Sequence, residues 1–338
     1  MSKLIGWENE LRKKNIVSIQ MNLLNRCTSK CKSCRKYTWP KDELDLDVAK
    51  RALKTLKEKF GLQSVVFSGG DPILYSGLSE LIDFCMENDV KYSLITTLIS
   101  KNTELLQKIA KTAYRIHVSV DGATTESYNY IRGVDGLTIV GNNICDMQSI
   151  RSKEGLIPIR ISSTISKMNC GEVISLYTFA KKRSCAINFY LVHTWDNLKM
   201  TKEQIKEFYR SMKIIAKDEK REKVTISNAK LLLADRYSFA SESSNCKVCY
   251  LPHVNCTIDA NGDIYPCCKL LDDNGEYGQQ TQYVYGNIYK EDLVGEFNKR
   301  FDRIYPSCDV CKECAQRYDG LLRDLEKIME EVKEPIFF

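Results

Sequence analysis

The sequence lacks long hydrophobic runs and contains very few histidines. No apolar stretch is long enough to cross a membrane, and the opening segment Met1–Trp7 is too short to be the hydrophobic part of a secretory signal. The three histidines in 338 residues are His117, His193 and His253. None of them lies close in sequence to the first cysteine group, at residues 27–34. A zinc knuckle needs a fourth cysteine or histidine nearby, so that type of site is not indicated there.

Charges of one sign are not clustered either. The net charge is +6 with a pI near 8.5, and Lys and Arg are interspersed with Asp and Glu. Nucleic-acid and membrane partners are therefore not indicated. An apolar content of 43% with 28% charged residues is ordinary for a globular protein with a large core. Fifteen cysteines without a signal sequence indicate a reducing, cytoplasmic setting, in which clustered cysteines are more often metal ligands than disulfides.

From residue 16 to about 195, short apolar runs alternate with amphipathic stretches, the pattern of repeated βα units around a parallel sheet. The predicted strands are Ile16–Met21, Ser64–Ser68, Tyr92–Thr97, Arg115–Val120, Ile159–Ile165 and Ala186–Leu191. The predicted helices are Leu46–Phe60, Leu78–Asn88, Thr103–Thr112, Leu137–Glu154, Glu172–Lys182 and Lys202–Lys217, with capping-box patterns at Asn169–Glu172 and Thr201–Gln204. The fold class is α/β. We expect an N-terminal segment (1–15), a partial (β/α)6 TIM-like barrel (16–225) and a cysteine-rich domain with a terminal helix (226–338).

Three cysteines, Cys27, Cys31 and Cys34, follow the first predicted strand with gaps of three and two residues. Thiolates at this spacing on one loop can hold three irons of a [4Fe–4S] cluster and leave the fourth iron open. This loop resembles the CxxxCxxC signature of the radical S-adenosylmethionine (radical SAM) superfamily. The resemblance implies that S-adenosylmethionine chelates the open iron and that an external one-electron donor, such as flavodoxin or ferredoxin, drives its cleavage. The resulting 5′-deoxyadenosyl radical would take a hydrogen atom from the substrate.

Polar residues at the ends of later strands match further motifs of the family. Ser68–Pro72 resembles the GGEP motif, with Asp71 in place of the usual glutamate, and His117–Gly122 contains an S-x-D-G sequence that related enzymes share. The resemblance implies cofactor contacts from Gly69, Gly70, Asp71, Pro72, Thr96, Ser119, Asp121 and Arg160. Arg160 would meet the carboxylate of S-adenosylmethionine. Taken singly, each polar residue is as readily explained as a hydrogen-bonded structural residue.

A second cysteine set occupies the tail of the chain. Its members are Cys249, Cys267, Cys308, Cys311 and Cys314, and the Asn261-Gly262 pair predicts a hairpin turn just before Cys267. This arrangement resembles the SPASM/twitch extensions of radical SAM enzymes, which hold auxiliary iron–sulfur clusters. The resemblance implies one auxiliary [4Fe–4S] cluster on Cys249, Cys267, Cys308 and Cys311, with Cys314 competing for one of the last two positions. A four-cysteine zinc ribbon is the alternative.

The substrate is the least constrained part of the prediction. Similar twitch enzymes include 2-deoxy-scyllo-inosamine dehydrogenase, so oxidation of a small polar molecule such as a sugar or aminocyclitol is the first expectation. Peptide modification by epimerisation or cross-linking is the second, and a non-catalytic zinc-binding scaffold is the alternative of another class. Cys170, just past the fifth predicted strand, would donate a hydrogen atom if the enzyme were an epimerase, although a buried structural cysteine is the more common case.

Overall fold

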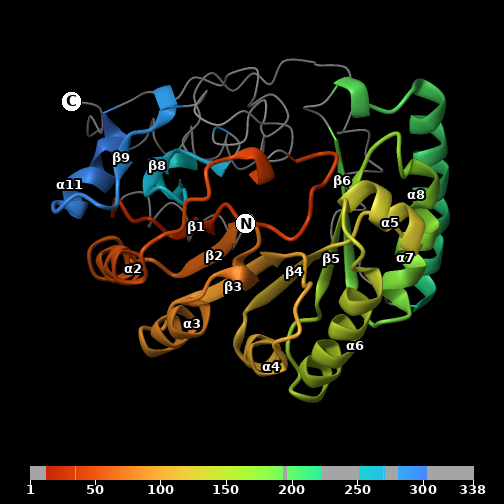
Figure 1. Cartoon of the computed structure of the whole chain (residues 1–338), viewed down its shortest axis with the longest axis horizontal. Coiled ribbons are helices and arrows are strands. Elements are labelled where there is room, and N and C mark those ends of the chain that lie inside the picture. Colours follow the sequence, from red (N-terminus) through yellow and green to blue (C-terminus); the bar gives the residue numbers. More distant parts are fainter. Residues whose placement is uncertain are drawn as a thin grey trace.

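The described part of the chain forms one curved sheet with helices on its outer face (Figure 1). The computed structural model describes residues 13–34, 36–192, 196–222, 251–268, 270 and 281–302. Within them the strand order is β6-β5-β4-β3-β2-β1-β7-β8-β9. No described helix is both long enough and apolar enough to cross a bilayer.

The barrel half of the sheet contains six parallel strands in sequence order, each followed by helical structure. The strands are β1 (Ser18–Leu24), β2 (Ser64–Gly69), β3 (Lys91–Thr96), β4 (Arg115–Ser119), β5 (Arg160–Ile165) and β6 (Ala186–Leu191). The helices are α2 (Leu46–Phe60), α3 (Leu78–Glu87), α4 (Thr103–Thr112), α5 (Thr125–Arg132), α6 (Leu137–Lys153), α7 (Val173–Lys181) and α8 (Lys202–Glu222). Short 3-10 turns lie at Lys36–Thr38, Pro72–Leu74, Cys170–Glu172, Asp196–Leu198 and Leu251–His253. The predicted partial, unclosed barrel is confirmed.

The core lies between the sheet and the helices. On α2 the apolar positions recur at helical spacing, and Ala49, Leu53 and Leu56 are fully buried. The helix begins where Asp45 accepts a hydrogen bond from the Val48 N–H (3.0 Å). It ends at Gly61, whose φ of 67° suits a residue without a side chain.

The tail of the chain adds three strands to the free edge of β1. Strand β7 (Asn255–Ile258) runs parallel to β1, and β8 (Asp263–Tyr265) and β9 (Gly286–Asn287) follow antiparallel, with α11 (Leu293–Asn298) behind them. The predicted hairpin is therefore confirmed, while its pairing with β1 was not predicted. The Asn22 side chain on β1 donates to the Asp259 carboxylate after β7 (2.9 Å), and both side chains are buried.

Two local predictions need correction. Helix α5 was missed because only Tyr128, Ile131 and Arg132 of its eight residues are buried, too few to give a clear helical stripe. The expected capping box at Asn169 is wrong: the Asn169 side chain instead donates to the carbonyls of Asp121 (2.8 Å) and Thr164 (2.9 Å).

The capping box at Thr201 is confirmed. The Gln204 N–H donates to the Thr201 hydroxyl (3.3 Å), and the Thr201 N–H donates to the Gln204 side chain (3.0 Å).

Candidate functional site

The loop with the first three cysteines leaves the carboxyl end of β1 and is clamped by the turn after β2. The Gly70 N–H donates to the Leu24 carbonyl (2.6 Å), and the Asp71 N–H donates to the Arg26 carbonyl (2.9 Å). A side chain on Gly70 would overlap the Arg26 carbonyl, and Gly69 has a φ of 127°. The two glycines are therefore needed for β2 to approach the base of the cysteine loop this closely.

The carboxyl end of α5 clamps the same loop from the other side. The Lys30 N–H donates to the Arg132 carbonyl, and the Lys32 N–H donates to the Ile131 carbonyl. Each of these N···O distances is 2.9 Å. Gly133 has a φ of 66°, and a Cβ there would lie 2.6 Å from the Lys30 carbonyl oxygen. The loop is thus fixed by backbone bonds on both flanks.

The three thiols lie within one partly enclosed region. Cys31 is buried, while Cys27 and Cys34 are half-buried. Burial raises the pKa of Cys31 to about 12 and also raises the pKa of Cys27, and the charge of Cys34 raises both further. In an unmetallated loop Cys27 and Cys31 would stay protonated at neutral pH, whereas bound iron holds its cysteine ligands as thiolates.

The donor set fits a four-iron cluster better than a single ion. Among the described residues, no three Cys, His, Asp or Glu side chains converge as ligands of one metal ion would. A [4Fe–4S] cluster takes its thiolates on separate irons, so its ligands need not meet at one point. Three sulfurs on one clamped loop match that requirement.

The structure places Asp71 beside Thr96 and Thr97 at the end of β3. One carboxylate oxygen of Asp71 accepts from the Thr96 hydroxyl (2.6 Å) and the Ile73 N–H (3.4 Å). The other accepts from the Thr97 N–H (3.2 Å) and the Thr97 hydroxyl. The side chain is fully buried, which raises its pKa. Both carboxylate oxygens of Asp71 thus accept hydrogen bonds from the chain's own donors. The backbone turns sharply just after these donors, where Leu98 has a φ of 60°.

Asp121, at the end of β4, is similarly engaged. Its carboxylate accepts from the Arg132 guanidinium (2.8 Å) and from the Thr164 N–H (2.7 Å). Ser119, two residues earlier, is half-buried on the sheet face opposite to the fully buried Val118. Of the predicted polar contacts at the carboxyl ends of the strands, the Ser119 hydroxyl is the one without a hydrogen bond within the described part of the chain.

Two predicted site residues lie apart from this group. Arg160 is the first residue of β5, at the opposite end of that strand from the cysteine loop. Cys170 belongs to the hydrophobic core next to α8, its pKa raised by burial, and its thiol donates to the Lys167 carbonyl (3.8 Å). Its placement suits a packing role.

Most of the predicted auxiliary ligands cannot be placed. Cys249, Cys308, Cys311 and Cys314 lie outside the described residues, as do His193 and the predicted domain boundary at residues 225 and 226. Cys267 is described and half-buried, two residues after β8.

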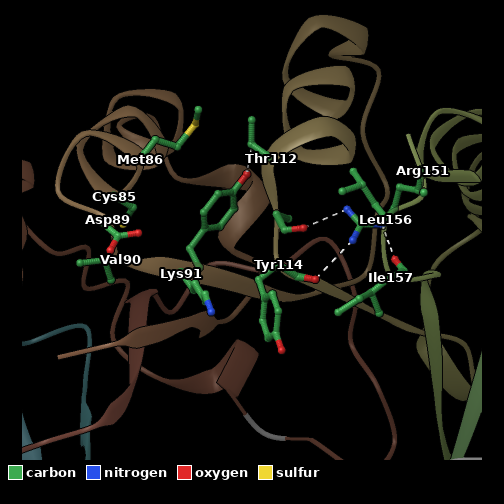
Figure 2. A pocket seen from close by; sticks show the side chains of 13 residues that line it. Cys85, Met86, Asp89, Val90, Lys91, Thr112, Tyr114, Arg151, Leu156 and Ile157 are labelled. Atoms are coloured by element: carbon green, nitrogen blue, oxygen red, sulfur yellow. Dashed lines mark hydrogen bonds between the residues drawn. The ribbon is translucent and has the colours of Figure 1, made fainter. Parts of the chain in front are cut away.

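A pocket of about 400 Å³ opens at the amino ends of β3 and β4, away from the cysteine loop (Figure 2). Its deepest charged group, Arg151, already donates to four backbone carbonyls. We therefore do not assign the reaction to it.

Two family models match the chain. Residues 21–138 match the radical SAM superfamily, and residues 249–315 match the SPASM iron–sulfur cluster-binding domain. The chain belongs to the radical SAM superfamily. Its radical SAM domain binds S-adenosylmethionine and a [4Fe–4S] cluster, and its SPASM domain binds auxiliary iron–sulfur clusters. When bound, the first cluster supplies the electron that splits S-adenosylmethionine.

Similar proteins include two curated relatives and a solved structure. The AdoMet-dependent heme synthase of Methanosarcina barkeri is 25% identical over 57% of this chain, which spans only 51% of that protein. The mycofactocin maturase MftC of Mycolicibacterium smegmatis is 21% identical over 81% of this chain and 72% of its own length. Streptococcus suis SuiB bound to the precursor peptide SuiA shares the fold, with a TM-score of 0.59 at 15% identity over 87% of this chain and 69% of SuiB.

These findings correct the expected partner of this radical SAM protein. The preference for a small-molecule substrate over a peptide is wrong, because the similar proteins include a maturase and a structure solved with a precursor peptide. The error arose from taking the substrate class from the resemblance to 2-deoxy-scyllo-inosamine dehydrogenase, whereas the cysteine motifs that carry the resemblance do not encode the substrate class.

The structure gives a specific role to residues whose contacts the sequence motifs do not predict. Arg132 and Gly133 hold the cysteine loop, and Thr97 shares the Asp71 carboxylate with Thr96. The Arg-Gly pair that follows the S-x-D-G sequence is the sequence signal for the contact of Arg132 and Gly133 with the cysteine loop.

Proposed function

We propose that this chain is a radical SAM enzyme that modifies a peptide. The observation that carries the proposal is the match to the mycofactocin maturase, which runs through both the radical SAM and the SPASM regions. The shared fold with peptide-bound SuiB supports it. The clamped three-cysteine loop supplies the site at which S-adenosylmethionine would be cleaved.

In this proposal the three cysteines bind the cluster and the strand ends bind S-adenosylmethionine. Gly69 and Gly70 allow the backbone to approach closely, and Pro72 starts the turn that follows. The Ser119 hydroxyl contacts the cofactor directly. The remaining predicted groups, Asp71, Thr96 and Asp121, act by holding the strand ends in position, since their side chains are bonded to one another or to neighbouring segments.

The second cysteine set completes the enzyme. Cys249, Cys267, Cys308 and Cys311, with Cys314 as the competing ligand, hold one auxiliary [4Fe–4S] cluster. A fully ligated cluster has no open iron for substrate, so its role is to accept an electron from the substrate radical. The finer reaction type, oxidative cross-linking or epimerisation, depends on whether that electron is removed.

The test is to incubate the anaerobically reconstituted protein with S-adenosylmethionine, a reductant and each small peptide encoded beside its gene. Mass spectrometry should show a modified peptide together with 5′-deoxyadenosine. The Cys31→Ser variant is the matched control and should form neither product. Cleavage of S-adenosylmethionine with every peptide unchanged, but with a small polar molecule converted, would contradict the proposal.

A further inference from the structure

The inner face of the sheet, turned away from α2 to α8, is polar along β4 and β5. On β4, Arg115, His117 and Ser119 alternate with buried apolar residues, and on β5 Arg160 and Ser162 do the same. The residues between them pack in the core against the helices: Ile116, Val118, Ile161 and Ile165. The parallel register places His117 directly beside Arg160. Two arginines and a histidine therefore share this inner face.

No acidic residue of strands β1 to β7 balances these charges. The sequences of β1 to β7 contain Lys91, Arg115 and Arg160 but no Asp or Glu. The Nε atom of Arg160 is buried and has no hydrogen-bond partner. Within the described part of the chain, neither Arg115 nor Arg160 forms an ion pair. A buried donor without a partner calls for an explanation, and a bound ligand is one.

Three other buried arginines of this chain have hydrogen-bond or ion-pair partners for their guanidinium groups. Arg132 pairs with Asp121, Arg151 donates to four carbonyls, and Arg300 donates to the carbonyls of His253, Phe297 and Lys14. The Nε of Arg132 also lacks a partner, but Arg132 still pairs with Asp121 through Nη1. Arg160 differs from all three because, within the described part of the chain, its guanidinium has no hydrogen bond and no ion pair at all.

The electrostatics of the cluster agree with an anion site. Burial, together with the charges of Arg160 and Arg115, lowers the pKa of His117 to about 4, so its ring is neutral at pH 7. Burial and the neighbouring Arg115 also lower the pKa of Arg160, because two cations face each other. Tyr190 is the other titratable group facing Arg160. A bound carboxylate would relieve this repulsion and accept the free guanidinium donors.

At its outer rim the cluster continues to Tyr114. The Arg115 guanidinium lies 5.1 Å and the Lys91 ammonium 5.4 Å from the centre of the Tyr114 ring, and Figure 2 shows Lys91 and Tyr114 pointing the same way. The positive surface therefore extends from the inner face to the solvent-exposed amino ends of β3 and β4.

We propose that Arg115, His117 and Arg160 bind an acidic side chain, Asp or Glu, of the substrate peptide. This inference rests on the proposed function and names a feature of the peptide, an acidic residue some distance from the modified one. Arg160 begins β5, and the strand's other end is five residues on, roughly 16 Å at 3.3 Å per residue. An extended peptide along the inner face would place its acidic anchor here and its reacting residue near the cysteine loop.

The test uses two N-acetylated, C-amidated hexapeptides that differ only in a central Glu or Gln, titrated calorimetrically into the reconstituted full-length protein. We expect the Glu peptide to bind about tenfold more tightly, as charge-assisted bidentate bonds allow. The preference should vanish in Arg160→Gln and in Arg115→Gln. Neither arginine has a hydrogen bond or ion pair in the described structure, and Arg115 loses only a contact with the partly exposed Tyr114 ring. Both variants should therefore stay folded, with melting temperatures close to that of the wild type.

Arg210→Gln is the matched control, since Arg210 is an exposed arginine on α8 that pairs with Glu207. It should keep the preference for Glu. Equal behaviour of the two peptides in the wild-type protein, whether both bind or neither does, would overturn the proposal.

S-adenosylmethionine also carries a carboxylate, so its affinity is measured in the same variants. Weaker cofactor binding in Arg160→Gln with the Glu preference intact would assign the arginine to the cofactor and overturn the proposal. The peptides need not be turned over. A clear Glu preference with no peptide ever modified would therefore refute the proposed function but support the site for an acidic side chain.

Discussion

Arg132 on α5 and Asp121 at the end of β4 form an ion pair, with 2.8 Å between Nη1 and Oδ2. Both side chains are buried, and the Arg132 carbonyl accepts the Lys30 N–H of the cysteine loop. The pair therefore links the end of a central strand to the backbone that presents Cys31. The loop geometry depends on this contact as well as on the cysteines themselves.

Arg132→Gln should lower the free energy of unfolding by about 3–5 kcal/mol, because it leaves the buried Asp121 carboxylate without its counter-charge. Urea denaturation monitored by circular dichroism measures the change. Arg210→Gln removes an exposed ion pair with Glu207 and should change stability by less than about 1 kcal/mol. Equal, small effects of the two substitutions would show that the buried pair does not hold the fold.

His117 gives a pH dependence with a defined sign. Its folded pKa of about 4 lies below the ordinary value of 6.5, so the unfolded state binds more protons between these two pH values. The stability that comes from keeping His117 neutral is full above pH 6.5 and is lost as the pH falls towards 4. His117→Gln should therefore flatten the curve of unfolding free energy against pH in this window.

His253 has a lowered pKa of about 4 for the same main reason, burial, and should retain its own share of the slope in His117→Gln. Parallel pH curves for the wild type and His117→Gln would contradict the assigned environment of His117.

Arg151 should contribute to stability without affecting the clusters. Its guanidinium donates to the carbonyls of Ile157 (2.6 Å), Ala110 (2.9 Å), Ala113 (3.0 Å) and Tyr114 (3.3 Å), several of them at the carboxyl end of α4. Figure 2 shows the bonds to Ile157 and Tyr114. Arg151→Met keeps an apolar stem but leaves these acceptors unpaired, so we expect a loss of at least about 3 kcal/mol. Iron content per folded chain should stay at the wild-type level. A loss of iron from a still-folded variant would contradict this separation.

The periodic parts of the fold were predictable from the sequence. Helix α2 and strand β6 have the predicted bounds, because their apolar positions follow the helix and strand periods. Helix α5 was not predictable in this way, since few of its residues face the core. The pairing of β7 with β1 joins residues more than two hundred positions apart and leaves no local pattern.

The site was predictable where motifs are local and not where contacts are distant. The cysteine spacing predicts Cys27, Cys31 and Cys34 as cluster ligands, but it does not predict that Thr96 and Thr97, at the end of the next strand, donate to the Asp71 carboxylate. The polar alternation of β4 was visible in the sequence. Its meaning depends on the strand register that brings His117 beside Arg160.

Iron content tests the number of clusters. We expect roughly eight irons per chain from two four-iron clusters, and about half of that in Cys267→Ala. Cys267→Ala should still cleave S-adenosylmethionine but should form no modified peptide, because the auxiliary cluster is lost. Cys85→Ala, which removes a buried cysteine of the core, is the control and should keep all its iron. About twelve irons in the wild type would show a second auxiliary cluster and refute the single-cluster assignment.

The central claim is that the loop clamped between β2 and α5 holds the cluster that cleaves S-adenosylmethionine. The most direct measurement is the release of 5′-deoxyadenosine by the triple variant Cys27→Ala, Cys31→Ala, Cys34→Ala under reducing conditions. We expect no detectable release, with iron retained in the SPASM domain at about half the wild-type level. Continued release of 5′-deoxyadenosine by this variant would contradict the claim.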